Sequence, residues 1–258
     1  MKQRTRWLYT ILFSIIMIGI IYQGYSLFQN VEYESLQNAQ FPHRSFAYIS
    51  IDLEIPQVSS DTGNIPTSMG SRGSGIAVGT TSEGNTAILT ANHVCNPPTF
   101  MVAVWTLGAT KTISVTDFFG NSYQARIILS DIQNDLCMLE IENWPHPTVK
   151  FAENPVNIGD EVYSVAAPMA FFSPGMVPLL DGYYSGDTFT SNGADSVYTV
   201  PATQGSSGSS ILNERGEIIG VVHSSLQGFQ SITICSTHTQ VKAFLLQFEY
   251  LLNGTLSQ

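Results

Sequence analysis

The chain carries little charge, and most of that charge is negative. Of its 258 residues, 12% are Asp, Glu, Lys or Arg, which is about half the share in average soluble domains. Lys and Arg number 10 against 20 Asp and Glu, and the first 30 residues hold three of these cations and no acid. The remainder, with 7 cations and 20 acids, therefore has a net charge of −13. Because phosphate binding needs a basic surface, this balance argues against nucleic acid as a partner.

Cysteine is also scarce. The chain has three cysteines, Cys95, Cys137 and Cys235, so it is not a disulfide-rich scaffold and its core must supply most of the stability. In an exported chain an odd count leaves at least one thiol unpaired or pairing between chains. Cys95 and Cys137 could lie near each other, but the sequence does not establish a bond. The favoured interpretation is that both are small buried hydrophobes.

The N-terminus, by contrast, contains a long apolar run. No residue from Trp7 to Val31 is charged, and Leu8–Tyr22 is rich in Ile and Leu. About 20 such residues span a hydrocarbon core of about 30 Å, so we expect a membrane anchor over residues 7–28. Basic residues precede the run and acidic residues follow it, namely Lys2, Arg4 and Arg6 before it and Glu32 and Glu34 after it.

The positive-inside rule therefore predicts a single-pass protein with residues 1–6 in the cytoplasm and the rest outside. The alternative is a cleaved signal peptide, which would make the remainder a secreted protein. Gly24-Tyr25-Ser26 has small residues at the spacing that signal peptidase reads, although it is not an A-x-A site.

Short β-like runs dominate the rest of the chain. Residues 29–69 are predicted to be a linker, in which Phe46–Leu53 has the character of an edge strand. From Gly70 onward about a dozen short β-like runs alternate with turn signals, which predicts an all-β barrel or sandwich rather than β–α units. Apolar residues at helical spacing then predict a helix near the C-terminus: Val241, Phe244, Leu245 and Phe248.

His93 is the best candidate for a catalytic base. A serine hydroxyl is a poor nucleophile at neutral pH and needs an adjacent base, which a third group must orient. His93 follows the apolar strand Ala87–Thr90, and the end of a strand can hold a base rigidly beside a cleft. The alternative is an ordinary histidine at a surface turn. Three other histidines have poorer settings, in the linker, between prolines and before the final helix: His43, His146 and His238.

Asp135 is the candidate for the orienting group. It precedes the apolar strand Leu136–Ile141, where a carboxylate can be partly buried, stay ionised and bind one ring nitrogen of His93. The alternative is a turn or cap aspartate. Asp131 is the rival candidate, but it begins no apolar run.

Ser207 is the candidate nucleophile. It lies in the segment Gly205-Ser206-Ser207-Gly208-Ser209-Ser210, for which the alternative is a flexible Gly/Ser linker. A predicted hairpin around Asn213–Gly216 follows at once, which favours a tight turn that exposes a side chain. The glycines allow unusual φ angles, so the N–H groups of Gly205 and Ser207 could form an oxyanion hole.

Together these segments resemble the trypsin-like, chymotrypsin-fold serine proteases, most closely the HtrA-like and glutamyl-endopeptidase-like branches. Thr90–Val94 is similar to T-x-x-H-V, Asp135–Leu139 to D-L-A-L-L, and Gly205–Asn213 to G-N-S-G-G-P-L-V-N. Ser71–Ile76 resembles the first barrel strand G-S-G-S-G-V/F, and Gly216–Gly220 resembles the hairpin G-x-V-I-G. The resemblance extends from about Gly70 to Leu252, and it is the combination of motifs that is specific.

The resemblance implies two packed six-stranded antiparallel β-barrels with the active site between them. We expect the first barrel over residues 70–152, and the second barrel with the terminal helix over residues 153–258. The family implies His93 as base, Asp135 as orienter and Ser207 as nucleophile. It also implies an acyl-enzyme route without metal or organic cofactor, and a protein or peptide as substrate.

Three features depart from the family pattern. Ser206 replaces the acid that digestive proteases carry before the nucleophile, so activation by pairing that acid with a freed N-terminus is not expected. Ser209 and Ser210 replace the usual Gly-Pro. No PDZ domain is expected after the final helix, unlike in most HtrA proteins.

The primary specificity pocket is predicted near Pro201, Ala202 and Thr203. No Asp stands there to bind a basic side chain, so a trypsin-like preference is not expected. His223 lies on the strand that would line this pocket, where glutamate-specific relatives place a histidine. The alternative is a partly exposed histidine that closes a strand. A Glu or Gln preference and a small or apolar preference therefore both remain open.

The sequence thus predicts a membrane-tethered, extracytoplasmic serine endopeptidase. Two alternatives belong to other classes of protein. One is a catalytically inactive, protease-like module that binds peptides, suggested by the changes at Ser206, Ser209 and Ser210. The other is a cell-surface β-sandwich adhesion module in which the three candidate residues coincide by chance.

Overall fold

The computed structural model describes residues 13–23, 41–54, 68–98, 108–190 and 193–255, and the chain divides into two units, Met1–Gln40 and Phe41–Gln258. In the first unit residues 13–23 form a helix with exposed apolar side chains. No helix among the described residues is long and apolar enough to span a membrane. The two ends of the predicted anchor, residues 7–12 and 24–28, lie outside the described residues.

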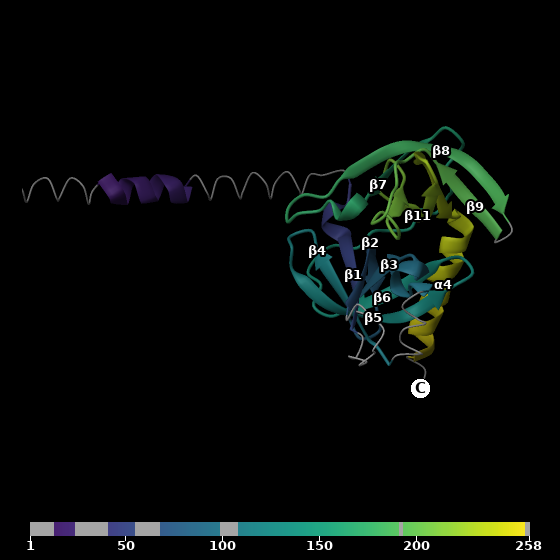
Figure 1. Cartoon of the computed structure of the whole chain (residues 1–258), viewed down its shortest axis with the longest axis horizontal. Coiled ribbons are helices and arrows are strands. Elements are labelled where there is room, and N and C mark those ends of the chain that lie inside the picture. Colours follow the sequence, from purple (N-terminus) through teal and green to yellow (C-terminus); the bar gives the residue numbers. More distant parts are fainter. Residues whose placement is uncertain (1–12, 24–40, 55–67, 99–107, 191–192, 256–258) are drawn as a thin grey trace, which may run out of the picture. The chain divides into compact units, whose positions relative to one another are not determined.

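The second unit begins with a closed six-stranded barrel, drawn in blue to teal in Figure 1. Its neighbouring strands run in the order β1-β2-β3-β6-β5-β4, and every pairing is antiparallel. The strands are β1 (Phe46–Glu54), β2 (Ser68–Thr80), β3 (Thr86–Thr90), β4 (Thr110–Asp117), β5 (Ser122–Asp131) and β6 (Leu136–Ile141).

Strand β1 closes this barrel, because it pairs with β2 on one side and with β4 on the other. The predicted edge strand is therefore an integral strand, and the first barrel begins at Phe46 rather than at residue 70. The physical reason is that buried apolar and exposed charged side chains alternate along β1. Ile49, Ile51 and Leu53 are fully buried, whereas Asp52 and Glu54 on the opposite face are exposed.

A second closed barrel, in green to yellow, follows with the order β10-β11-β12-β9-β8-β7. Its strands are β7 (Glu161–Val165), β8 (Leu179–Thr190), β9 (Gly193–Tyr198), β10 (Ser210–Leu212), β11 (Ile218–Leu226) and β12 (Phe229–Ser236). The helix α4 (His238–Thr255) comes last and buries Val241, Phe244 and Phe248. The predicted all-β fold, with two six-stranded barrels and a C-terminal helix, is confirmed.

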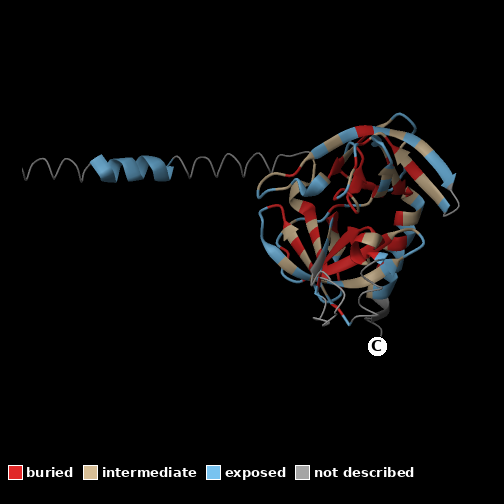
Figure 2. Ribbon diagram, viewed as in Figure 1, coloured by how far each residue is buried: buried red, intermediate tan, exposed pale blue. Residues whose placement is uncertain are grey.

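Each barrel encloses its own apolar core, as the red segments in Figure 2 show. The first core includes Ile49, Ile88 and Leu139, and the second includes Val162 and Ile219, all fully buried. Three short helices occur among the described residues of the second unit: η1 (His43–Ser45) before β1, α2 (Asn92–Cys95) after β3, and η2 (Pro168–Ala170) after β7. Of these, α2 and η2 lie beside the candidate active site.

A buried carboxylate holds one end of the first barrel together. Asp117 ends β4, and His146 lies in the segment after β6; their side chains are only 0% and 5% exposed. The Nε2 atom of His146 lies 2.7 Å from Oδ2 of Asp117. The same carboxylate accepts hydrogen bonds from the hydroxyl of Tyr123, from the backbone N–H of Phe119, and from both the backbone and side chain of Asn121. Burial alone raises the pKa of Asp117, but the hydrogen bonds from His146, Asn121 and Tyr123 outweigh burial and lower it below the usual value.

We predict that Asp117→Asn lowers the free energy of unfolding by about 2 kcal/mol at neutral pH, because the carboxylate anchors several hydrogen bonds. A folded-state pKa below the unfolded value of about 3.9 makes the ionised carboxylate stabilising above that pH, and this stabilisation is lost as the pH falls through the folded pKa. Urea denaturation between about pH 7 and pH 3 should show a smaller acid-induced loss in the variant. Asp52→Asn, at an exposed ion pair with Arg72, should change stability by less than about 1 kcal/mol. Equal acid sensitivity of wild type and Asp117→Asn would contradict this assignment.

Candidate active site

The β3–β6 ladder brings two of the predicted residues together. Thr90 at the end of β3 pairs with Cys137 near the start of β6. His93, in α2 just after β3, and Asp135, just before β6, therefore lie at the same end of the ladder. The backbone N–H of Asn92 donates to the carbonyl of Asp135 at 3.1 Å and fixes the two segments to each other.

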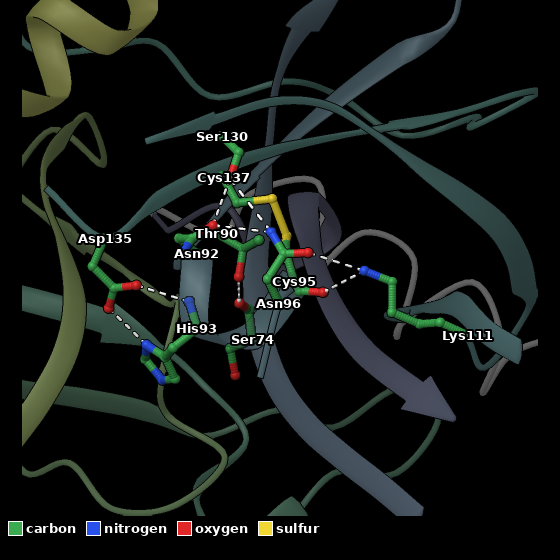
Figure 3. The surroundings of a disulfide bond; sticks show 10 residues. All are labelled: Ser74, Thr90, Asn92, His93, Cys95, Asn96, Lys111, Ser130, Asp135 and Cys137. Carbon is green, nitrogen blue, oxygen red and sulfur yellow. Dashed lines mark hydrogen bonds and ion pairs between the residues drawn. A yellow bond between two sulfur atoms is a disulfide. The ribbon is translucent and has the colours of Figure 1, made fainter. Parts of the chain in front are cut away.

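The carboxylate of Asp135 binds His93 at two points, as Figure 3 shows. One oxygen accepts the backbone N–H of His93 at 2.8 Å, and the other lies 2.6 Å from Nδ1 of its ring. Engaging Nδ1 in this way leaves Nε2 as the ring nitrogen available to a reacting group. The side chains are 37% and 25% exposed, so the pair is accessible to a substrate. Asp135 has a left-handed φ of 53°, a conformation that Asp tolerates better than most residues.

A disulfide between Cys95 and Cys137 clamps the same two segments (Figure 3). Both half-cystines are fully buried, and each lies two residues after one member of the His93–Asp135 pair. The interpretation of these two residues as unbonded hydrophobes was therefore wrong. Sequence spacing does not reveal that antiparallel pairing of β3 with β6 brings them together. Cys235 is a free thiol in the core of the second barrel, and its burial raises its pKa well above the usual value.

The loop that carries Ser207 lies between β9 and β10 and packs against the first barrel. The N–H of Gly208 donates to the carbonyl of Val222 at 2.7 Å. A Cβ atom added to Gly208, which has φ +83°, would clash with the hydroxyl of Thr90 and lie 2.9 Å from the N–H of Ala91. The loop thus rests against the end of β3, immediately before His93, and only glycine fits there.

Gly73 on β2 lies between the Ser207 loop and α2. A Cβ atom at Gly73 would lie 2.7 Å from both methyl groups of Val94 and 3.0 Å from the carbonyl oxygen of Ser207. The residue after His93 and the backbone of Ser207 therefore contact the same glycine. The structure brings all three candidate catalytic residues into one region.

The two amides predicted to form an oxyanion hole differ from the neighbouring amides in their hydrogen bonding. The N–H groups of Ser206, Gly208 and Ser209 donate to backbone carbonyls at 2.7–3.0 Å. Within the part of the chain that the structure describes, the N–H groups of Gly205 and Ser207 have no such acceptor. Gly205 has φ +92°. Two amides without acceptors beside a serine are able to stabilise a developing negative charge.

Three of the four predicted pocket residues lie together. Ala202 is buried and its N–H donates to the carbonyl of Gln230 at 2.9 Å. The hydroxyl of Thr203 accepts from the side-chain amide of Gln230 at 3.3 Å and lies 3.9 Å from the sulfur of Met169. Pro201, the next residue toward the N-terminus, is exposed.

The fourth, His223, lies elsewhere. Its Nε2 atom is 3.1 Å from a carboxylate oxygen of Asp195, and it lines a cavity of about 480 Å³ that Asp135, Asp195 and Gln240 also line. The preceding Val222 points into the core of the second barrel, so alternation along β11 directs His223 to the other side. Within the described residues no group of three or more His, Cys, Asp or Glu side chains could hold a metal ion.

A family model for the trypsin-like peptidase domain matches residues 73–221, which include His93, Asp135 and Ser207. The chain belongs to this family. The resemblance seen in the sequence is thereby confirmed, and a trypsin-like peptidase is expected to act on a protein or peptide.

Solved serine proteases share the fold of this trypsin-like domain. Rv3671c from M. tuberculosis H37Rv, in an inactive form, is 14% identical with a TM-score of 0.57, and the match covers 81% of this chain and 88% of that one. A second structure of the inactive Rv3671c protease gives 16% identity and a TM-score of 0.58, over 83% and 94% of the two chains. The serine endoprotease from Yersinia pestis is 18% identical with a TM-score of 0.56, over 84% of this chain and 66% of that one.

We predict that the Cys95–Cys137 disulfide contributes about 2–4 kcal/mol to stability, because it closes a loop across 42 positions. The double variant Cys95→Ala/Cys137→Ala should lose about 2–4 kcal/mol of unfolding free energy, measured by chemical denaturation. Dithiothreitol should lower the stability of the wild type to a similar extent and leave the double variant unchanged. If the reductant shifts both proteins equally or shifts neither, the bond does not stabilise the barrel.

Proposed function

We propose that this trypsin-like peptidase is a serine endopeptidase with His93 as base, Asp135 as orienting residue and Ser207 as nucleophile. One observation carries the proposal: the Asp135 carboxylate binds both the backbone and Nδ1 of His93 at 2.8 and 2.6 Å. Such a bidentate interaction fixes the ring orientation and directs Nε2 outward. The loop of Ser207 lies against the strand end from which His93 emerges.

The proposed reaction forms an acyl-enzyme. The Oγ atom of Ser207 attacks the carbonyl carbon of the scissile bond, and its proton passes to Nε2 of His93. Asp135 stabilises the resulting imidazolium, and the amides of Gly205 and Ser207 bind the oxyanion of the tetrahedral intermediate. The intermediate collapses when His93 gives the proton to the leaving amine. Water, deprotonated by His93, then attacks the acyl carbon, and the proton returns to Ser207.

We infer a preference for a neutral side chain on the substrate residue before the scissile bond. The pocket residues Ala202 and Thr203 and their neighbour Gln230 carry no charge. His223, the candidate receptor for an acidic side chain, is engaged by Asp195 and lines a different cavity. Of the two preferences that the sequence left open, this arrangement supports a small or apolar side chain over glutamate.

The inactive-module alternative rested partly on Ser209 and Ser210, which replace Gly-Pro. Both residues are buried, with exposures of 1% and 2%, and the hydroxyl of Ser209 accepts a hydrogen bond from Ser164 of β7 at 3.0 Å. These serines therefore belong to the interior of the second barrel. They give no reason to assign a defect in catalysis.

We also propose that residues 7–28 tether the peptidase to a membrane with its barrels on the extracytoplasmic side. The buried Cys95–Cys137 disulfide supports this location, because disulfides persist in oxidising compartments. The uncharged run from Trp7 to Val31, with three cations before it, supports the tether.

The triad is tested by reaction of the full chain with a fluorophosphonate probe, which labels activated serines. We expect the wild type to react and Ser207→Ala and His93→Ala not to react. Asp135→Asn should slow labelling by about 10⁴-fold, because the ring loses its orienting charge. The matched control is Asp160→Asn, at a turn aspartate that accepts the N–H of Asn157, and it should react at close to the wild-type rate. A folded wild type that does not react would contradict the proposed activity and favour the peptide-binding module.

The tether is tested by alkaline extraction of membranes from cells that express the full chain. We expect the full chain to stay in the membrane pellet and a chain without residues 1–28 to be released, because about 20 apolar residues make insertion stable. N-terminal sequencing of the mature protein separates the two possibilities. A mature chain that begins just after Ser26 would establish a cleaved signal instead.

A further inference from the structure

Ser74 of β2 joins the first barrel to the loop that carries Ser207. It is fully buried, and each of its polar groups is bonded. Its backbone N–H donates to the carbonyl of Ser207 at 2.8 Å, and its carbonyl accepts the hydroxyl of Thr90 at 2.7 Å. Its hydroxyl donates to the carbonyl of Gly205 at 2.8 Å and accepts the N–H of Ala167 at 3.0 Å. One serine thus bonds the backbone on both sides of Ser206.

The orientation of the Gly205 amide is fixed through its own peptide plane. The carbonyl of Gln204 accepts the N–H of Met169 at 2.6 Å. Because the C=O and N–H of a trans peptide point in opposite directions, the N–H of Gly205 points away from Met169. This is one of the two amides that have no acceptor among the described residues.

The next peptide, between Gly205 and Ser206, is hydrogen-bonded at both its carbonyl and its N–H. Its carbonyl, on Gly205, accepts the hydroxyl of Ser74, and its N–H, on Ser206, donates to the carbonyl of Thr203 at 2.9 Å. The side chain of Ser206 adds only a contact within the loop, in which it accepts the N–H of Thr203 at 3.3 Å. Among the described residues, the hydroxyl of Ser74 is therefore the side-chain group that ties this part of the loop to the first barrel.

The η2 turn packs against Gly205 and holds it from the other side. Met169 and Ala170 adopt left-handed φ angles of 53° and 58°, which are costly for residues other than glycine. A Cβ atom on Gly205 would lie 3.2 and 3.1 Å from their N–H groups and would clash with the carbonyl of Ala167. Because Ser74 also binds the N–H of Ala167, its hydroxyl bridges the turn and the loop.

We propose that Ser74 is a positioning residue for the oxyanion site. Its hydroxyl holds the carbonyl of Gly205 and the turn at Ala167, so that the N–H of Gly205 points to the place where the substrate oxygen becomes charged. The inference rests on the proposed peptidase function. Oxyanion donors act only at about 2.7–3.1 Å from the developing charge, so a loop that is free to rotate would lose catalysis before it lost substrate binding.

The test compares Ser74→Ala with Ser45→Ala in the full chain. Ser45 is the matched control, because it is also fully buried, lies in η1 directly before β1, and donates one hydrogen bond, at 2.7 Å, to the carbonyl of Pro147. Ser74→Ala should lose somewhat more stability in urea than Ser45→Ala, because it removes two hydrogen bonds rather than one. We would measure kcat and KM on a peptide p-nitroanilide with alanine before the scissile bond, and the rate of fluorophosphonate labelling of Ser207.

We expect Ser74→Ala to lower kcat and the labelling rate by about 10- to 100-fold with KM within about threefold, since losing one oxyanion donor outright costs about 10²–10³. Ser45→Ala should stay within about threefold on each measure. If Ser74→Ala does not fold, Ser74→Gly carries the same test, because it deletes the hydroxyl together with the Cβ atom and keeps the backbone hydrogen bonds of residue 74.

Equal kinetics of the Ser74 and Ser45 variants, with wild type labelled at Ser207, would overturn the role of Ser74 and leave the proposed activity standing. A loss confined to KM would also overturn it. A wild type that is not labelled would overturn the activity and this inference together.

Discussion

The two hydrogen bonds between the Asp135 carboxylate and His93 are the interaction on which the rest of the site depends. They need the end of β3 and the start of β6 at the same edge of the first barrel, which the Thr90–Cys137 pairing provides. The Cys95–Cys137 disulfide and the hydrogen bond from Asn92 to the Asp135 carbonyl hold the same two segments. The β3–β6 pairing, the disulfide and the bonds to Asp135 thus all fix the position of the His93 imidazole ring. A general base requires such a fixed position.

Each barrel also positions a part of the site that the other barrel carries. From the first barrel, Ser74 binds the backbone of Gly205 and Ser207, which belong to the loop entering the second barrel. From the second barrel, the hydroxyl of Ser236 at the end of β12 donates to the carbonyl of Asn134 at 2.7 Å, beside Asp135. Both serines are almost completely buried, so these bonds act in a low dielectric where they are strong. The geometry of the site therefore depends on the packing of both barrels.

The sequence predicted what is encoded locally. Alternation and turn signals were sufficient for the all-β class, and three short motifs identified the family and brought attention to His93, Asp135 and Ser207. Features that depend on contacts between residues far apart in the sequence could not be predicted from it. That β1 closes the barrel follows only from its pairing with both β2 and β4. The disulfide follows only from the register between β3 and β6. The side to which His223 points depends on which residues of β11 face the core. Ser74 offered only one signal, a serine between Gly73 and Gly75, because the two partners of its hydroxyl lie 131 and 93 positions away.

The catalytic role of Ser207 and its oxyanion site is best examined in a crystal structure of the full chain after reaction with a fluorophosphonate. We expect a covalent phosphonyl group on Oγ of Ser207, with one phosphonyl oxygen about 2.7–3.1 Å from the N–H groups of both Gly205 and Ser207. The His93–Asp135 bonds should be retained, with Nε2 of His93 facing the adduct. A phosphonyl oxygen that faces solvent, or a Gly205 amide turned away from it, would contradict the proposed oxyanion site.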